Sequence, residues 1–120
     1  MRKNTVEEKS KCFALKIIKL VQDLESKNQY ILAKQILRSG TSIGANIAES
    51  VYAASKADFV NKLSIAQKEA NETENWLSLL FKSGIIDELT FKSLRNKCGK
   101  IRRMLIASIT TVKSKMNGQK

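Results

Sequence analysis

The sequence predicts an all-α protein, an antiparallel four-helix bundle with up-down-up-down connections, formed by residues 1–120 as a single domain. The 120 residues include no proline and only five glycines, so few positions interrupt a helix. Apolar residues recur at steps of three and four along four segments, which is the period of one helix face. Short polar turns separate these segments, and short turns make neighbouring helices run antiparallel.

The first two helices are expected at residues 6–25 and 29–52. Thr5 and Glu8 have the spacing of a capping box at the start of the first helix. Its apolar face consists of Phe13, Ile17, Leu20 and Leu24. A polar turn at residues 26–28 ends it. The face of the second helix consists of Ala33, Ile36, Gly40, Ile43 and Ile47.

The other two helices are expected at residues 56–82 and 88–115. Ser55 and Asp87 are the expected N-caps, and Gly84 supplies a stop between the two helices. The inner face of the third helix consists of Phe59, Leu63, Ala66, Ala70, Thr73, Leu77 and Leu80, in a heptad pattern. That of the fourth consists of Leu94, Cys98, Ile101, Leu105, Ser108 and Val112.

The positive charge is concentrated near the end of the chain. The net charge is +11, and no acidic residue follows Glu88. Six cations of the fourth helix fall off its apolar face: Lys92, Arg95, Lys97, Lys100, Arg102 and Arg103. With few acids nearby to neutralise them, they form a candidate surface for a polyanion such as nucleic acid. A merely solvated face is the alternative.

The second helix carries small residues at steps of four: Gly40, Gly44 and Ala48. Such spacing favours close approach of a second backbone, either another helix of the bundle or another subunit. Asn46 lies one turn from Ser42, and the two are expected to hydrogen-bond across that contact. Trp76 is either a core residue or an anchor at an interface.

The composition argues against an enzyme. The chain has no histidine, the commonest general base and metal ligand, and no glycine-rich phosphate loop of the Walker type. Glu69 and Glu72 could in principle bind Mg²⁺, but a solvated face is the favoured interpretation. Cys12 and Cys98 match no metal spacing and are read as small, partly buried hydrophobes. No metal or other cofactor is therefore expected. Without a membrane span or signal peptide in the sequence, a cytoplasmic protein is expected.

Three stretches carry a resemblance to a known family. Residues 38–49 (RSGTSIGANIAE), 55–59 (SKADF) and 62–77 (KLSIAQKEANETENWL) resemble the bacterial four-helix-bundle family named for proteins encoded in intervening sequences of 23S rRNA genes. The resemblance covers residues 13–105. It implies an up-down bundle that assembles into ring-like pentamers, and no catalytic residues. It also implies relatives that bind nucleic acid as accessory proteins to the reverse transcriptase of diversity-generating retroelements. Many members have proline at the position of Gly44 and glycine at that of Ser50, so a bend there can differ.

Together these observations predict a non-enzymatic, basic homo-oligomer, with the number five coming from the resemblance. It is expected to bind RNA or DNA through phosphates, with little sequence preference. The alternative is a protein-interaction module that docks an acidic partner such as a reverse transcriptase. A membrane-surface protein is disfavoured, because the apolar faces are as narrow as those that bundles bury.

Overall fold

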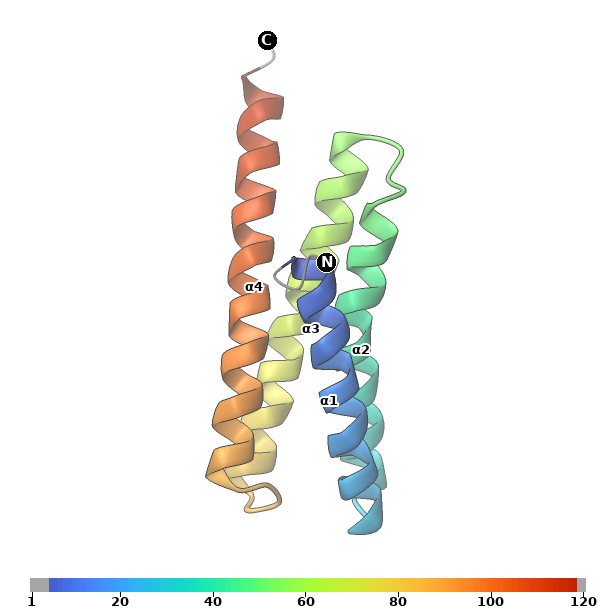
Figure 1. The fold of residues 1–120 in the computed structure, drawn as a ribbon, viewed down its shortest axis with the longest axis vertical. Helices are drawn as coiled ribbons and strands as arrows, with labels where there is room; N and C mark the ends of the chain where they lie inside the picture. The colour runs from blue at the N-terminus through green and yellow to red at the C-terminus, as the bar shows by residue number, and fades with distance from the viewer. Residues whose placement is uncertain (1–4, 119–120) are drawn as a thin grey trace.

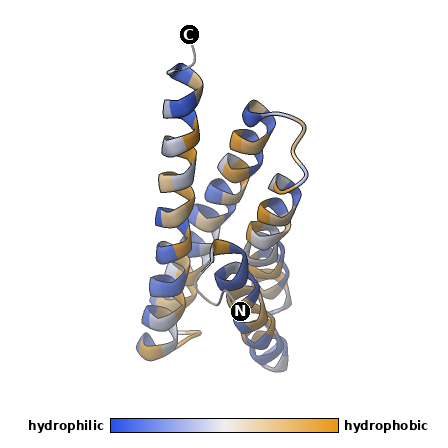
Figure 2. Ribbon diagram, turned by 45° about the horizontal axis from the view of Figure 1, so that its top comes forward, coloured by the Kyte–Doolittle hydropathy of each residue, from blue (hydrophilic) through white to orange (hydrophobic). Residues whose placement is uncertain are grey.

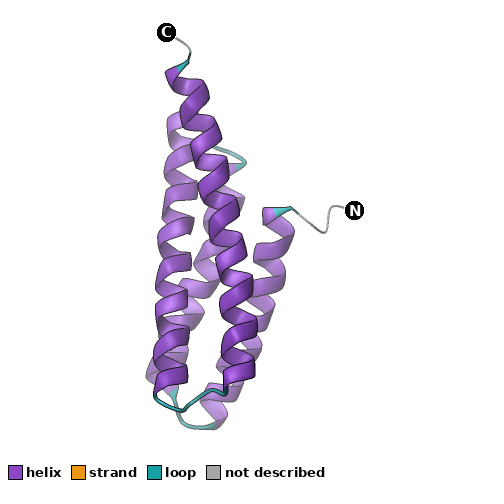
Figure 3. Cartoon of the chain, turned by 90° about the vertical axis from the view of Figure 1, so that its left-hand side faces the viewer, coloured by secondary structure: helices purple, strands orange, loops and turns teal. Residues whose placement is uncertain are grey.

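The computed structural model describes residues 5–118 and confirms the all-α fold. The helices are α1 (Val6–Ser26), α2 (Tyr30–Ser50), α3 (Lys56–Lys82) and α4 (Glu88–Asn117). They run up and down in turn (Figure 1), and no strand occurs between residues 5 and 118 (Figure 3). Each helix packs on the next along the chain, while α1 and α4 share the least extensive contact of the neighbouring pairs.

Three of the four helices begin at the caps expected from the sequence. The Thr5 hydroxyl accepts a hydrogen bond from the Glu8 amide at 3.2 Å. Ser55 Oγ accepts from the amide of Asp58 at 3.0 Å, and Asp87 Oδ1 accepts from that of Thr90 at 2.7 Å. Each bond satisfies an amide that the first turn of a helix leaves without a partner.

The end of α1 and the start of α2 each lie one residue later than predicted, at Ser26 and Tyr30, and two helix ends differ by two residues. Helix α2 ends at Ser50 rather than at residue 52, and α4 continues to Asn117 rather than to residue 115. The residues after Ser50 form the loop that leads to the Ser55 cap, whereas neither glycine nor proline lies between residue 115 and Gly118. The stop at Gly84 is confirmed, because its φ of +79° lies in the left-handed region that favours glycine.

The predicted inner faces of α1 and α2 are buried at every position, and Figure 2 shows hydrophobic residues alternating with hydrophilic ones around each helix. Three predicted positions are only partly buried: Phe59, Ser108 and Val112. Ile109 is buried in α4 instead. The reason is that α1 has 21 residues against 27 in α3 and 30 in α4. It therefore begins partway up the bundle and leaves one end of α3 and α4 without its cover (Figure 1).

Polar groups between α2 and α3 are paired. Thr73 Oγ1 lies 2.9 Å from Ser39 Oγ in the buried interface. Nearer the surface, the Arg38 guanidinium forms ion pairs with both Glu69 and Glu72. Both carboxylates thus already pair with one arginine, which offsets one of their two charges and does not favour the Mg²⁺ interpretation. None of the helices within residues 5–118 is long and apolar enough to cross a membrane.

Candidate nucleic-acid interface

The six cations predicted on α4 do not form one surface. Lys97 and Lys100 line a hollow shared with α1. Arg102 reaches α3, where its Nε lies 2.6 Å from Glu74 Oε2. Arg95 also lies on the α3 side, because its guanidinium carbon is 5.0 Å from the centre of the Phe91 ring, which stacks on the α3 residue Phe81. Lys92 and Arg103 are exposed.

Two of these cations are neutralised, contrary to the expectation of a face without local acids. The pair of Arg102 with Glu74 is largely shielded, and its hydrogen bond raises the pKa of Arg102. Lys92 Nζ lies 2.6 Å from Glu88 Oε2, and the hydrogen bond and charge of Lys92 lower the pKa of Glu88. Both pairs reduce the charge that these residues can offer to a phosphate.

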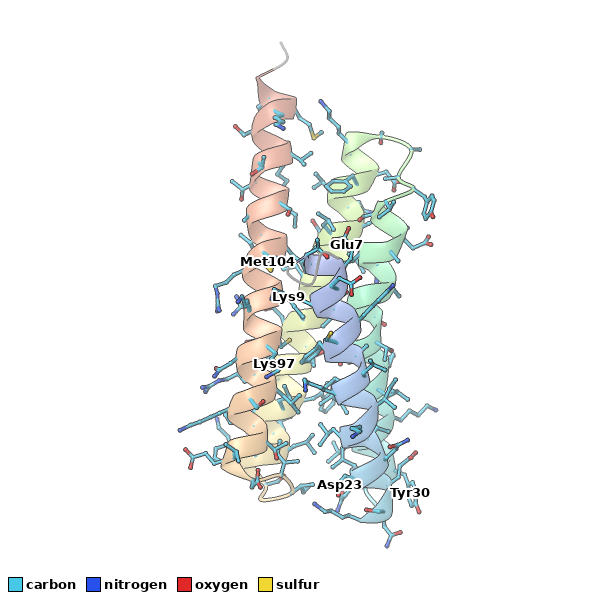
Figure 4. The ribbon with its side chains drawn as sticks, viewed as in Figure 1. Glu7, Lys9, Asp23, Tyr30, Lys97 and Met104 are labelled. Carbon is cyan, nitrogen blue, oxygen red and sulfur yellow. The ribbon has the colours of Figure 1, made fainter. Side chains whose placement is uncertain are left out.

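Other cations, without an ion pair within residues 5–118, lie in a hollow between α1 and α4. Four lysines line this hollow, which we call the lysine groove. Its lining consists of Lys9, Cys12, Phe13, Lys16, Lys97, Lys100 and Ile101, around a cavity of about 200 Å³. Figure 4 labels Lys9 and Lys97, which lie on α1 and α4 where the two helices face each other. The two helices thus bring lysines from opposite ends of the sequence to one place.

No ion pair within residues 5–118 neutralises these four lysines. Lys97 Nζ has a hydrogen bond to Ser93 Oγ at 3.3 Å, which leaves its charge unchanged. The neighbouring hollow along the same two helices contains Lys16, Lys19 and Asp23, and Asp23 is paired with Lys27 at 3.0 Å. The lysine groove therefore combines four lysines that lack ion pairs within the described residues with an apolar floor.

The contribution of α1 to this basic surface was not predicted from the sequence. Lys9 and Lys16 are seven residues apart, so they lie on one side of the helix, beside Phe13 of the apolar face. That spacing could have predicted a basic strip on α1. The spacing alone does not show which helix the strip faces.

The small residues of α2 face α1 within the same chain. A Cβ at Gly40 would lie 2.9 Å from two carbons of Ile17, and a Cβ at Gly44 would lie 3.2 Å from Ser10 Oγ. Ala48 is exposed. The close approach at the two glycines is therefore one between helices of the bundle.

The expected hydrogen bonds across this contact were wrong. Asn46 Nδ2 donates to the backbone oxygen of Ser42 at 2.9 Å, and Ser42 Oγ donates to that of Arg38 at 2.6 Å. Both bonds stay within α2, because a polar side chain in a helix can reach the carbonyl four residues earlier. Trp76 is half-buried, and its indole N–H donates to Glu72 at 3.2 Å.

The two cysteines differ in their surroundings. Cys98 is fully buried, and burial, aided by the charge of Glu74, raises its pKa to about 12. Cys12 is exposed in the lysine groove, so the expectation that it is partly buried was wrong. At neutral pH Cys12 is therefore the reactive thiol and Cys98 the inert one.

Comparison with known proteins identifies the relatives of this bundle. The family model for the 23S rRNA-intervening sequence protein matches residues 2–107. A crystal structure of a protein of unknown function from the S23 ribosomal protein family of Bacteroides thetaiotaomicron VPI-5482 is 48% identical. It covers 88% of this chain and 98% of its own, with a TM-score of 0.86. No curated protein sequence matches. The match to the family model over most of the chain shows that it belongs to the 23S rRNA-intervening sequence protein family.

Proposed function

We propose that this protein is a non-enzymatic, basic nucleic-acid-binding protein that contacts RNA or DNA mainly through phosphates. The observation that carries the proposal is the set of unpaired lysines that α1 and α4 place together, in a chain with a net charge of +11. Lysines that neutralise phosphates release condensed counterions, which gives affinity with little dependence on sequence. The absence of histidine from the sequence supports a role other than catalysis.

Contacts to bases contribute little in this proposal. Single-strand binders commonly stack bases on aromatic rings, but Phe13 in the lysine groove is 1% exposed. The exposed aromatic side chains within residues 5–118, Tyr30 and Tyr52, lie at the start of α2 and just after its end. Affinity is thus expected to depend on charge and salt.

The proposal includes assembly into a homo-oligomer, with five subunits as the family resemblance implies. Large apolar side chains stand exposed on the surface, among them Ile31 and Leu89 at 80% and 81%, and such residues favour association when they form patches. Light scattering should give about five times the chain mass of 13.5 kDa. A mass of 13.5 kDa at micromolar concentration would contradict the assembly without affecting the binding proposal.

The test compares two variants with the same change of charge. In the first, Lys97, Lys100 and Arg103 of α4 are changed to Glu. In the matched control, Lys34, Lys56 and Lys68 are changed to Glu; these are exposed cations of α2 and α3. Gel-shift titrations with unrelated RNAs and DNAs across a salt series measure affinity, and circular dichroism checks that both variants stay helical.

The α4 variant should weaken binding to every nucleic acid by a similar factor, well beyond the effect of the control. Its salt dependence should also flatten, because each lost contact to duplex DNA removes about 0.9 from the slope of log affinity against log salt. Equal losses in both variants would show that net charge alone attracts nucleic acid. Failure of the wild type to bind any nucleic acid at low salt would refute the proposal and favour docking to an acidic protein partner.

A further inference from the structure

The lysine groove is built differently from the rest of the bundle surface. Because α1 and α4 share the least extensive contact, their adjoining faces leave a hollow instead of a closed seam. Its floor includes Phe13 and Ile101, both 1% exposed. Lys9 and Lys16 stand on one wall, and Lys97 and Lys100 on the other. A ligand in the hollow therefore lies between lysine side chains of two helices.

The chemistry of the lining selects an anion. The residues that line the groove include four lysines and no carboxylate. Four like charges around one hollow repel one another, and an anion placed between them relieves that repulsion. Several phosphates in a row relieve this repulsion better than one phosphate does, because the lysines are spread along both helices.

We propose that the lysine groove holds the backbone of a single, unpaired nucleic-acid strand, with its phosphates inward and its bases outward. This inference rests on the proposed function and names the form of nucleic acid. A cavity of about 200 Å³ is smaller than the roughly 300–1,000 Å³ pockets that enclose drug-sized ligands. It has room for part of one backbone, so the second strand of a duplex would have to lie outside it. The floor offers neither an exposed aromatic ring nor a charged partner for a base.

The spacing of the lysines sets the length of strand that the groove can hold. Lys9 and Lys16 are seven residues apart on α1, which is about 10 Å along the helix axis. A strand that lies along this length passes all four lysines, two on each wall. With one phosphate beside each lysine, about four phosphates are held. Affinity for oligonucleotides should rise steeply up to about four nucleotides and more gradually beyond.

The first experiment measures binding of fluorescent 12-nucleotide strands and of the corresponding duplexes by anisotropy. Four contacts to a single strand give a salt slope of about −3, or about 50-fold weaker binding at 200 mM salt than at 50 mM. The Lys9→Gln, Lys16→Gln double variant should lose only about sevenfold over the same range. The matched control is Lys34→Gln, Lys68→Gln, which should behave as wild type. The wild type should bind the duplex at least tenfold more weakly than the single strand.

The second experiment locates the strand with a thiol already in the groove. Cys12 is exposed there, whereas Cys98 is buried with a raised pKa, so neutral iodoacetamide should alkylate Cys12 alone. A saturating single strand should slow this alkylation at least fivefold. The control is the Cys12→Ser, Asn71→Cys variant, which carries its thiol at an exposed position of α3. The single strand should not change the rate at which this thiol is alkylated.

The outcomes separate this inference from the proposed function. If wild type binds nucleic acid but Cys12 stays unprotected, or if the double variant keeps the full salt slope, the strand lies elsewhere and the inference fails alone. Equal affinity for duplex and single strand would also overturn it. If no nucleic acid binds at 50 mM salt, both proposals fail together.

Discussion

The contact between α1 and α2 makes a quantitative prediction about two glycines in the same helix. At Gly40, an added Cβ would lie 2.9 Å from both Cγ1 and Cγ2 of Ile17, a fully buried side chain. Overpacking of this kind costs about 1–3 kcal/mol. Replacing a helical glycine by alanine contributes about 1 kcal/mol of helix propensity. Gly40→Ala should therefore lower the free energy of unfolding by about 0–2 kcal/mol.

Gly44→Ala is the matched comparison. Its Cβ would meet Ser10 Oγ at 3.2 Å, so a small shift of one hydroxyl group relieves the contact. The same propensity gain should then leave this variant as stable as wild type or up to about 1 kcal/mol more stable. The two variants should differ by up to about 3 kcal/mol, with Gly40→Ala the less stable.

Urea unfolding followed by circular dichroism at one fixed protein concentration measures this difference, since association would make stability depend on concentration. Truncation of the neighbour in Ile17→Ala, Gly40→Ala should remove the clash, so that Gly40→Ala stabilises in that background. If Gly40→Ala matches or exceeds Gly44→Ala in stability, the reasoning from close approach is wrong.

Three further predictions concern single contacts, each measured by urea unfolding. Burial raises the pKa of the Cys98 thiol to about 12 in the folded state, whereas the pKa of an unfolded thiol is about 8.5. The free energy of unfolding should therefore fall between about pH 9 and pH 12, and fall less in Cys98→Ala. Equal pH profiles of the two proteins would contradict this. Thr73→Val removes the hydroxyl that bonds Ser39 Oγ at 2.9 Å and leaves the buried Ser39 only its 3.5 Å bond to the Ile36 backbone oxygen. It should cost about 1–3 kcal/mol, and Ser39→Ala, Thr73→Val should cost less than the sum of the single changes. Additivity would count against the bond. Ser55→Ala removes a helix cap and should cost about 1 kcal/mol, so an unchanged midpoint would show that the cap contributes nothing.

The sequence by itself determined the helices and most of the core, because these depend on local spacing. Apolar steps of three and four identified faces that are buried throughout α1 and α2, and three side chains marked helix starts that the structure confirms. The pair of Glu88 with Lys92 spans four residues of one helix. This pair could therefore also have been predicted from the sequence, but it was not.

Only the tertiary structure decided which charges remain free and where they gather. Arg102 is neutralised by Glu74 and Arg38 by Glu69 and Glu72, across pairs of helices. The lysine groove unites residues about 90 positions apart in the chain, since α1 packs beside α4. Helix periodicity fixes the face on which a side chain stands, but not the helix that the face meets. That choice depends on how four helices of unequal length bury their apolar faces together.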